Sequence, residues 1–156
     1  NDEIEIDDAV REYNVFSMVY REPRDKLWKE AWKITEGLLI LMKKEVAEKN
    51  AKFLVVTLSN DHQVNPDVLA RERFKNKMGI KDLFYPDRRI QAIGKKGGFQ
   101  VLSLGKSFQE LATKNEVYLH GHGRTLGLGH FNKAGHQLAG EKIAEHICKN
   151  FKTWSP

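Results

Sequence analysis

Residues 53–58 read Phe-Leu-Val-Val-Thr-Leu, and residues 99–104 read Phe-Gln-Val-Leu-Ser-Leu. Short runs of β-branched and apolar residues are typical of strands that are buried on both faces of a parallel sheet. Residues 117–119 (Val-Tyr-Leu) form a third and shorter run of this kind. Helical patterns alternate with these runs, which predicts an α/β fold: a three-layer α/β/α flavodoxin-like sandwich with a mostly parallel sheet.

The helical patterns lie between and around the predicted strands. Residues 25–49 carry apolar residues at three- and four-residue steps, including Trp28 and Trp32, which we interpret as core or interface residues. In the final helix, we expect a buried stripe at four-residue steps from Ala139 through Ile143 and Ile147 to Phe151. We read residues 1–22 as a lead-in segment and residues 23–156 as a single domain. Helices are predicted at residues 25–49, 67–78, 87–96, 107–114 and 132–150.

Composition excludes several classes of protein. The chain has 156 residues, 40% of them apolar and 30% charged, which is typical of one globular domain. The net charge of +5 is spread over several segments without a stacking-aromatic pattern, so we expect no nucleic acid partner. No apolar run reaches about 18 residues, so we expect no membrane contact by this chain. A single cysteine, Cys148, excludes an internal disulfide framework and a cysteine-based zinc cluster.

Polar loops follow the predicted strands. The segment from Ser59 through Asn60 and Asp61 to Asn65 follows the first strand, and residues 120–132 follow the third. Because the carboxyl ends of parallel strands meet at one edge of a sheet, we expect these loops to converge there. Candidates for substrate contact or support are therefore Ser59, Asn60 and Asp61 in the first loop and His120, His122 and Asn132 in the second.

The second loop is rich in histidine: it carries His120, His122 and His130, and His136 follows it. His120 and His122 in extended chain could begin a metal site, but no HExxH motif and no nearby carboxylate accompany them, so we expect neither a metal nor a cofactor. The alternatives are acid–base chemistry at near-neutral pH and a purely structural role. Of the four, His130 is the candidate base, because it directly precedes a helix for which Asn132 is a good N-cap.

The segment from His130 to Ala139 reads H-F-N-x-x-G-H-x-x-A and resembles the closing block of the SGNH hydrolases, the GDSL-type esterases. The resemblance covers about residues 7–151 and implies a serine-based esterase or carbohydrate O-acyl esterase or transferase in which His130 is the general base. The implied substrate is a small ester or an acylated carbohydrate. The implied location is the bacterial cytoplasm or, with a missing signal or anchor, the periplasm or cell envelope. Further similarity to the C-terminal half of larger bacterial SGNH-type proteins lies in residues 20–23, 28–36, 53–59, 81–89 and 120–121.

The chain departs from the family pattern in two ways. Gly127 stands where the family has an aspartate three residues before the catalytic histidine, so Asp61 or a backbone carbonyl would have to orient His130. No G-D-S block supplies the nucleophile, and the chain begins with Asn1 rather than Met. We therefore expect the chain to be the C-terminal part of a larger domain, with the serine outside it, and to be inactive alone.

Two other interpretations follow from the same residues. Without a nucleophile or an orienting aspartate, the chain could be a non-catalytic SGNH-like binding or assembly module that forms a homodimer. Separately, Gly105-Lys106-Ser107 follows a strand as a phosphate-binding loop would, but position 100 is glutamine instead of the glycine that this motif needs. We therefore predict that Ser107 is a helix N-cap.

Overall fold

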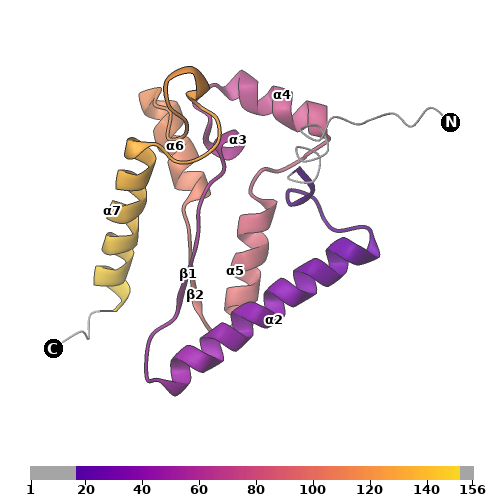
Figure 1. The fold of residues 1–156 in the computed structure, drawn as a ribbon, viewed down its shortest axis with the longest axis vertical. Helices are drawn as coiled ribbons and strands as arrows, with labels where there is room; N and C mark the ends of the chain where they lie inside the picture. The colour runs from indigo at the N-terminus through magenta and orange to yellow at the C-terminus, as the bar shows by residue number, and fades with distance from the viewer. Residues whose placement is uncertain (1–16, 152–156) are drawn as a thin grey trace.

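Helices dominate the chain in the computed structural model, which describes residues 17–151 (Figure 1). Within that range the sheet has two strands, β1 (Leu54–Thr57) and β2 (Gln100–Ser103), paired in parallel with Thr57 opposite Ser103. The predicted three-layer sandwich with a mostly parallel sheet is therefore wrong. Residues 117–119 form no strand, because their backbone turns to the loop that follows: Asn132 N–H donates to the Leu119 carbonyl, and His120 forms an antiparallel bridge with Phe131.

The predicted helices are confirmed with small shifts at their ends. Asp25, Asp67 and Asn132 cap α2, α4 and α7 through side-chain oxygens that accept backbone N–H groups. The predicted cap at Ser107 is wrong: α6 begins at Gly105, and Ser107 Oγ donates to the Leu104 carbonyl. Two short helices, α3 and η1, occupy segments predicted as loops. The described helices are α2 (Lys26–Glu48), α3 (Asp61–Val64), α4 (Val68–Met78), α5 (Tyr85–Gly97), α6 (Gly105–Asn115), the 3₁₀ helix η1 (Gly123–Thr125) and α7 (Lys133–Asn150).

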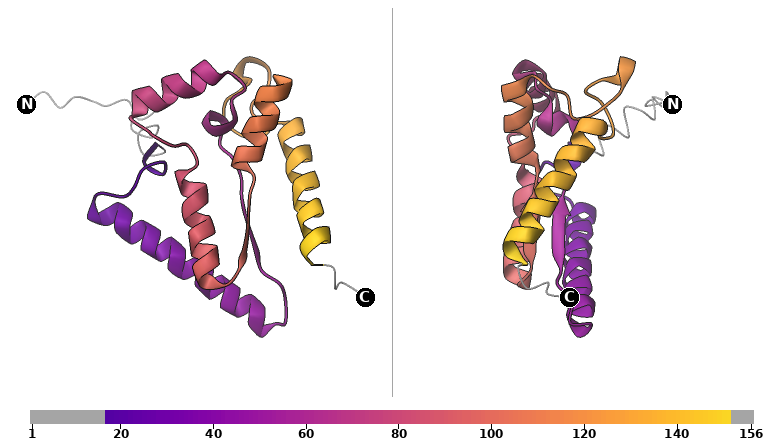
Figure 2. Two further views of the ribbon diagram at one scale, coloured as in Figure 1. Left: turned by 180° about the vertical axis from the view of Figure 1, so that it is seen from behind. Right: turned by 90° about the vertical axis from the view of Figure 1, so that its left-hand side faces the viewer.

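The strand pair lies between α5 and α7, as both views of the ribbon show (Figures 1 and 2). Helix α5 can approach β2 closely because Gly94 has no side chain: a Cβ there would collide with Val101. Helix α2 packs against α5 through Trp32, whose ring meets Tyr85 edge-on and lies 4.5 Å from the Arg89 guanidinium carbon.

Two clusters of buried side chains form the core. Tyr20, which belongs to the predicted lead-in segment, is buried in the second cluster. Residues 1–16 of that segment lie outside the described range. In α7 Ala139 is buried, but Ile147 is 45% exposed, so the predicted stripe is wrong at that position. The first cluster is Val64, Leu104, Phe108, Ala112, Leu119 and Ala139, and the second is Tyr20, Phe74, Met78, Ile80 and Leu83.

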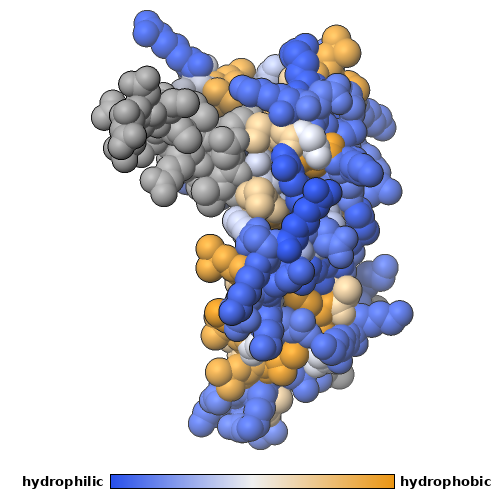
Figure 3. All heavy atoms as spheres, turned by 90° about the vertical axis from the view of Figure 1, so that its right-hand side faces the viewer, coloured by the Kyte–Doolittle hydropathy of each residue, from blue (hydrophilic) through white to orange (hydrophobic). Residues whose placement is uncertain are grey.

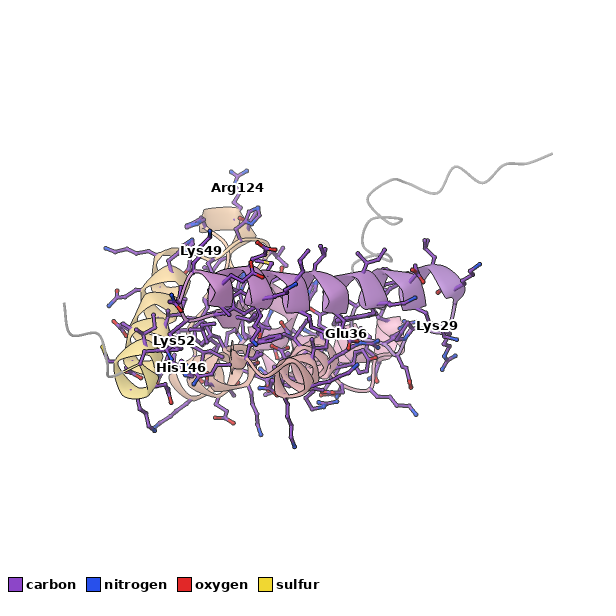
Figure 4. All side chains as sticks on the ribbon, turned by 90° about the horizontal axis from the view of Figure 1, so that it is seen from below. Lys29, Glu36, Lys49, Lys52, Arg124 and His146 are labelled. Atoms are coloured by element: carbon purple, nitrogen blue, oxygen red, sulfur yellow. The ribbon has the colours of Figure 1, made fainter. Side chains whose placement is uncertain are left out.

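Helix α2 leaves much of its apolar surface uncovered. Trp32 is its buried residue, and an ion pair of 2.6 Å between Glu36 and Lys96 also joins it to α5. Figure 4 shows the helix lying along the underside of the molecule, with Lys29, Glu36 and Lys49 spaced along it. Figure 3 shows a face on which apolar side chains gather in the lower half. The large apolar side chains of α2 that are at least half exposed are Leu27, Ile34, Leu38, Leu41 and Met42.

No helix among residues 17–151 combines the length and the apolar character that a membrane crossing needs.

Candidate functional site

The two polar loops meet at the carboxyl end of the strand pair. The amide of Gly129 donates a hydrogen bond of 2.7 Å to Asp61 Oδ2, across 68 residues of sequence. Asp61 is the first residue of α3, directly after β1, and Gly129 precedes His130 in the loop before α7. This contact joins the two loops that the sequence places at one edge of the sheet.

A buried carboxylate fixes the position of α3. Asp87 of α5 is 5% exposed, and its Oδ1 accepts hydrogen bonds of 2.7 Å from the hydroxyls of Thr57 and Ser103 at the ends of β1 and β2. Its Oδ2 accepts from Gln63 Nε2 at 2.8 Å, and that amide also donates to the Leu83 carbonyl. Gln63 lies in α3, so Asp87 ties the helix that carries Asp61 to the ends of both strands.

The loop that carries His130 is closed by its own backbone. Gly127 N–H donates to the His120 carbonyl at 2.8 Å, and Gly121 N–H donates to the His130 carbonyl at 2.9 Å. Gly121 has φ +77, and a Cβ there would collide with the carbonyl oxygen of Thr125. The loop therefore depends on glycine at this position, and it ends where Asn132 caps α7.

His120 is the first residue of this loop, and it is buried, with 4% of its surface exposed. Its Nδ1 is 2.6 Å from the carbonyl oxygen of Gly129, and its ring lies 4.5 Å from that of Phe131. Burial lowers the pKa of His120, and the hydrogen bond to Gly129 and the nearby Asp61 carboxylate only partly oppose this effect. The backbone of Gly129 is thus held at its N–H by Asp61 and at its C=O by His120.

A pocket of about 300 Å³ opens beside Asp61 and His130. One wall is aromatic: the imidazole of His62 stacks on Phe74 with ring centroids 4.0 Å apart, and burial lowers the pKa of His62. Another part of the pocket lining is polar: Asn60 Nδ2 donates to Tyr20 Oη at 2.9 Å. Burial raises the pKa of Tyr20 to about 12, so its hydroxyl is protonated at neutral pH. The lining residues are Ser17, Tyr20, Asn60, Asp61, His62, Phe74, Gly129 and His130.

The structure brings some of the predicted site residues together and separates others. Asn60, Asp61 and His130 line the pocket, and His130 is exposed to solvent. Asp61 accepts from the backbone of Gly129 instead of from the His130 ring, so within residues 17–151 no hydrogen bond joins the two side chains. Ser59 is buried, and its Oγ has no hydrogen-bond partner in that range.

Four predicted site residues lie outside the pocket lining: the buried Ser59 and His120, and also His122 and Asn132. His122 is exposed at the start of η1, where its backbone bonds to Thr125. The side chain of Asn132 is used within the fold: Oδ1 accepts from Gly135 N–H at 3.0 Å, and Nδ2 donates to the Tyr118 carbonyl at 2.8 Å. Asn132 therefore contributes by holding the start of α7 in place.

Sequence reasoning missed the aromatic wall of the pocket. His62 follows Asp61 in a segment read as loop, and the short helix there turns its ring onto Phe74. Tyr20 belongs to a segment that was read as a lead-in. The available signal was the Asn60-x-x-Gln63 spacing, which is a helix-start pattern: Gln63 Oε1 accepts from Asn60 N–H at 2.7 Å.

Within residues 17–151, no cluster of three or more His, Cys, Asp or Glu side chains could hold a metal ion. Comparison with known protein families, with curated proteins and with solved structures finds no match.

Proposed function

We propose that this chain carries the general-base part of an ester hydrolase of the SGNH type, with His130 as the base. The supporting observation is that Asp61 and His130, from loops far apart in sequence, line one pocket and are joined through the Gly129 amide. The substrate class we propose is a small ester or an acylated carbohydrate, since a pocket of about 300 Å³ with one aromatic and one polar wall suits a short acyl group beside hydroxyls.

The proposed chemistry uses His130 twice. The imidazole takes the proton of a serine hydroxyl as the serine oxygen attacks the ester carbonyl, and an oxyanion forms. When the C–O bond to the alcohol breaks, the imidazolium returns its proton to the leaving alcohol and an acyl-serine remains. A water molecule, deprotonated by the same imidazole, then attacks the acyl-serine carbonyl. As the C–O bond to the serine breaks, the imidazolium returns the proton to the serine oxygen and the acid leaves. The resemblance assigns that serine to a position outside this chain.

The Asp61 carboxylate would assist this cycle without touching the His130 ring. It would do so through its hydrogen bond from the Gly129 N–H, which restrains the backbone of the residue that precedes the base.

The test is the hydrolysis of p-nitrophenyl acetate by the full natural polypeptide that contains this sequence. We expect hydrolysis that falls by roughly 1,000-fold or more in kcat/KM on His130→Ala, as removal of a triad base does. His136→Ala is the matched control, because His136 lies on the same segment and does not line the pocket. Equal losses in the two variants, or no hydrolysis by the wild type, would reject the proposal.

A second candidate function is supported by a different observation. Helix α2 exposes Ile34, Leu38 and Leu41 on one face, with Leu27 one heptad before Ile34. An exposed apolar stripe of this spacing is typical of a helix that packs against another helix. A non-catalytic assembly module that pairs through α2 is therefore the alternative to the hydrolase.

Sedimentation of the wild type and of Leu38→Glu tests this alternative. An assembly module should sediment as a dimer at micromolar concentration and as a monomer after Leu38→Glu. Leu69→Glu is the control, because Leu69 is 67% exposed on α4, away from that stripe. A wild type that remains monomeric at all accessible concentrations would remove support for pairing through α2.

A further inference from the structure

The hydrogen bond between His120 and Gly129 determines which ring nitrogen of His120 is protonated. A carbonyl oxygen only accepts hydrogen bonds, so Nδ1 must carry the proton in its 2.6 Å contact with the Gly129 oxygen. In the neutral ring Nε2 is then a bare acceptor. Nε2 is buried and has no hydrogen-bond partner within residues 17–151.

The surroundings of His120 favour the neutral ring. It is packed against Phe131 and is almost completely removed from water. The ionisable side chains near it are Asp61, which favours a positive charge on the ring, and His130 and His62, which oppose one. Burial outweighs the attraction of Asp61, so the pKa of His120 is lowered and its ring is neutral at neutral pH.

The hydrogen bond from His120 acts on the peptide group that joins Gly129 to His130. Gly129 is the residue before His130, and its carbonyl carbon is bonded to the His130 nitrogen. With Asp61 on the Gly129 N–H and Gly121 N–H on the His130 carbonyl, His120 completes a set of three hydrogen bonds around the backbone of these two residues. Glycine has wide backbone freedom, so residue 129 needs such restraints to hold its neighbour in one orientation.

We propose that His120 is a positioning residue for His130: as the neutral Nδ1–H tautomer, it fixes the Gly129 peptide and thereby the direction in which the His130 ring projects into the pocket. This inference rests on the proposed role of His130 and adds a residue to that site. It separates the two histidines by function, since His130 exchanges protons with the reacting groups and His120 keeps its Nδ1 proton throughout.

The tautomer is tested directly by nitrogen NMR of the full natural polypeptide labelled with ¹⁵N-histidine. At neutral pH, the ring of His120 should show a protonated Nδ1 and a bare Nε2, and its signals should disappear in His120→Phe. A protonated Nε2 with a bare Nδ1, or rapid exchange between both forms, would overturn the proposal whether or not the protein hydrolyses esters.

Two variants separate positioning from simple packing. In His120→Asn the side-chain amide nitrogen takes the place of Nδ1 and keeps a donor for the Gly129 carbonyl, whereas in His120→Gln it takes the place of Nε2 and loses that donor. We expect His120→Gln to lower kcat by roughly 100-fold with little change in KM, as a small misplacement of a reacting group does. His120→Asn should restore most of that loss.

The outcomes remain distinct from those of the hydrolase proposal. Equal kcat in the Asn and Gln variants, with both folded by circular dichroism, would show that the donor to Gly129 is not what matters and would overturn the inference. If the wild type hydrolyses no ester, the His130 proposal fails, and the NMR readout still decides the tautomer of His120. The ring signals of His130 in both variants would then report whether its orientation depends on His120.

Discussion

The carboxylate of Asp61 accepts the amide proton of Gly129 at 2.7 Å and thereby joins the loop after β1 to the loop before α7. Its other oxygen accepts from the His62 amide at 2.6 Å, at the start of α3. One side chain therefore satisfies a helix-start amide and positions the residue before the candidate base. Several measurable consequences follow from this arrangement and from the contacts around it.

Replacement of Asp61 by alanine should loosen the loop before α7. The substitution removes an ionised acceptor from the Gly129 amide, and we expect a loss of about 1 to 2 kcal/mol in local stability. Hydrogen exchange of residues 120–132 measures this loss. Asp67→Ala is the control, because Asp67 caps α4 in a comparable way and should leave exchange in that loop unchanged. Unchanged exchange in Asp61→Ala would mean that the bond to Gly129 does not hold the loop.

Asp87→Ala should destabilise the whole chain by about 3 kcal/mol, because the half-buried hydroxyls of Thr57 and Ser103 and the buried amide of Gln63 would lose their common acceptor. Urea unfolding followed by circular dichroism gives the change in the free energy of unfolding. The comparison is Asp82→Ala, which removes a more exposed carboxylate from the segment just before α5. If the two variants lose the same stability, Asp87 does not tie the strands to α3.

Gly121→Ala should cost more stability than Gly123→Ala. Both positions have positive φ, which costs a non-glycine residue about 1 kcal/mol or more, but only at Gly121 would the new Cβ collide with the Thr125 carbonyl. Thermal unfolding of the two variants in parallel isolates the effect of the collision. Equal melting temperatures would contradict the close packing of the loop.

Stability should fall as the pH falls below about 6.5, the unperturbed pKa of histidine. Burial lowers the pKa of both His62 and His120 in the folded state, so the unfolded chain binds more protons below that pH, and the free energy of unfolding decreases until the folded pKa values are passed. Urea unfolding from about pH 8 to about pH 5 measures this slope. His120→Asn should reduce the dependence of the free energy of unfolding on pH, and the exposed control His122→Gln should not. If His120→Asn leaves this pH dependence unchanged, it arises from other groups.

Local patterns in the sequence predicted the helices well, because caps such as Asp25, Asp67 and Asn132 act within a few residues of their own position. The number of strands in the sheet was overestimated. Residues 117–119 have the composition of a strand, but their backbone partners come from the loop around Asn132, a contact that composition cannot reveal. The same applies to Ile147, whose periodicity suggests burial although it is 45% exposed among residues 17–151.

The candidate site was predictable in part. The convergence of the two loops was predicted from their positions after strands, and Asp61 and His130 do line one pocket, although residues 117–119 before the second loop form no strand. The hydrogen-bond partners of single atoms could not be predicted from the sequence. The Gly129 carbonyl accepts from His120, and Asp61 contacts a backbone amide instead of the His130 imidazole. Such details depend on how a glycine-rich loop folds back on itself, and residue spacing does not encode that geometry.

Chemical rescue is the sharpest test of His130 as a general base. His130→Gly in the full natural polypeptide leaves a space for free imidazole beside the pocket. We expect hydrolysis of p-nitrophenyl acetate to be lost in this variant and to return as imidazole is added, saturating with concentration, while the wild type gains no such saturating activity. A His130→Gly variant that hydrolyses the ester as fast as the wild type, or one whose lost activity imidazole does not restore, would contradict the general-base role.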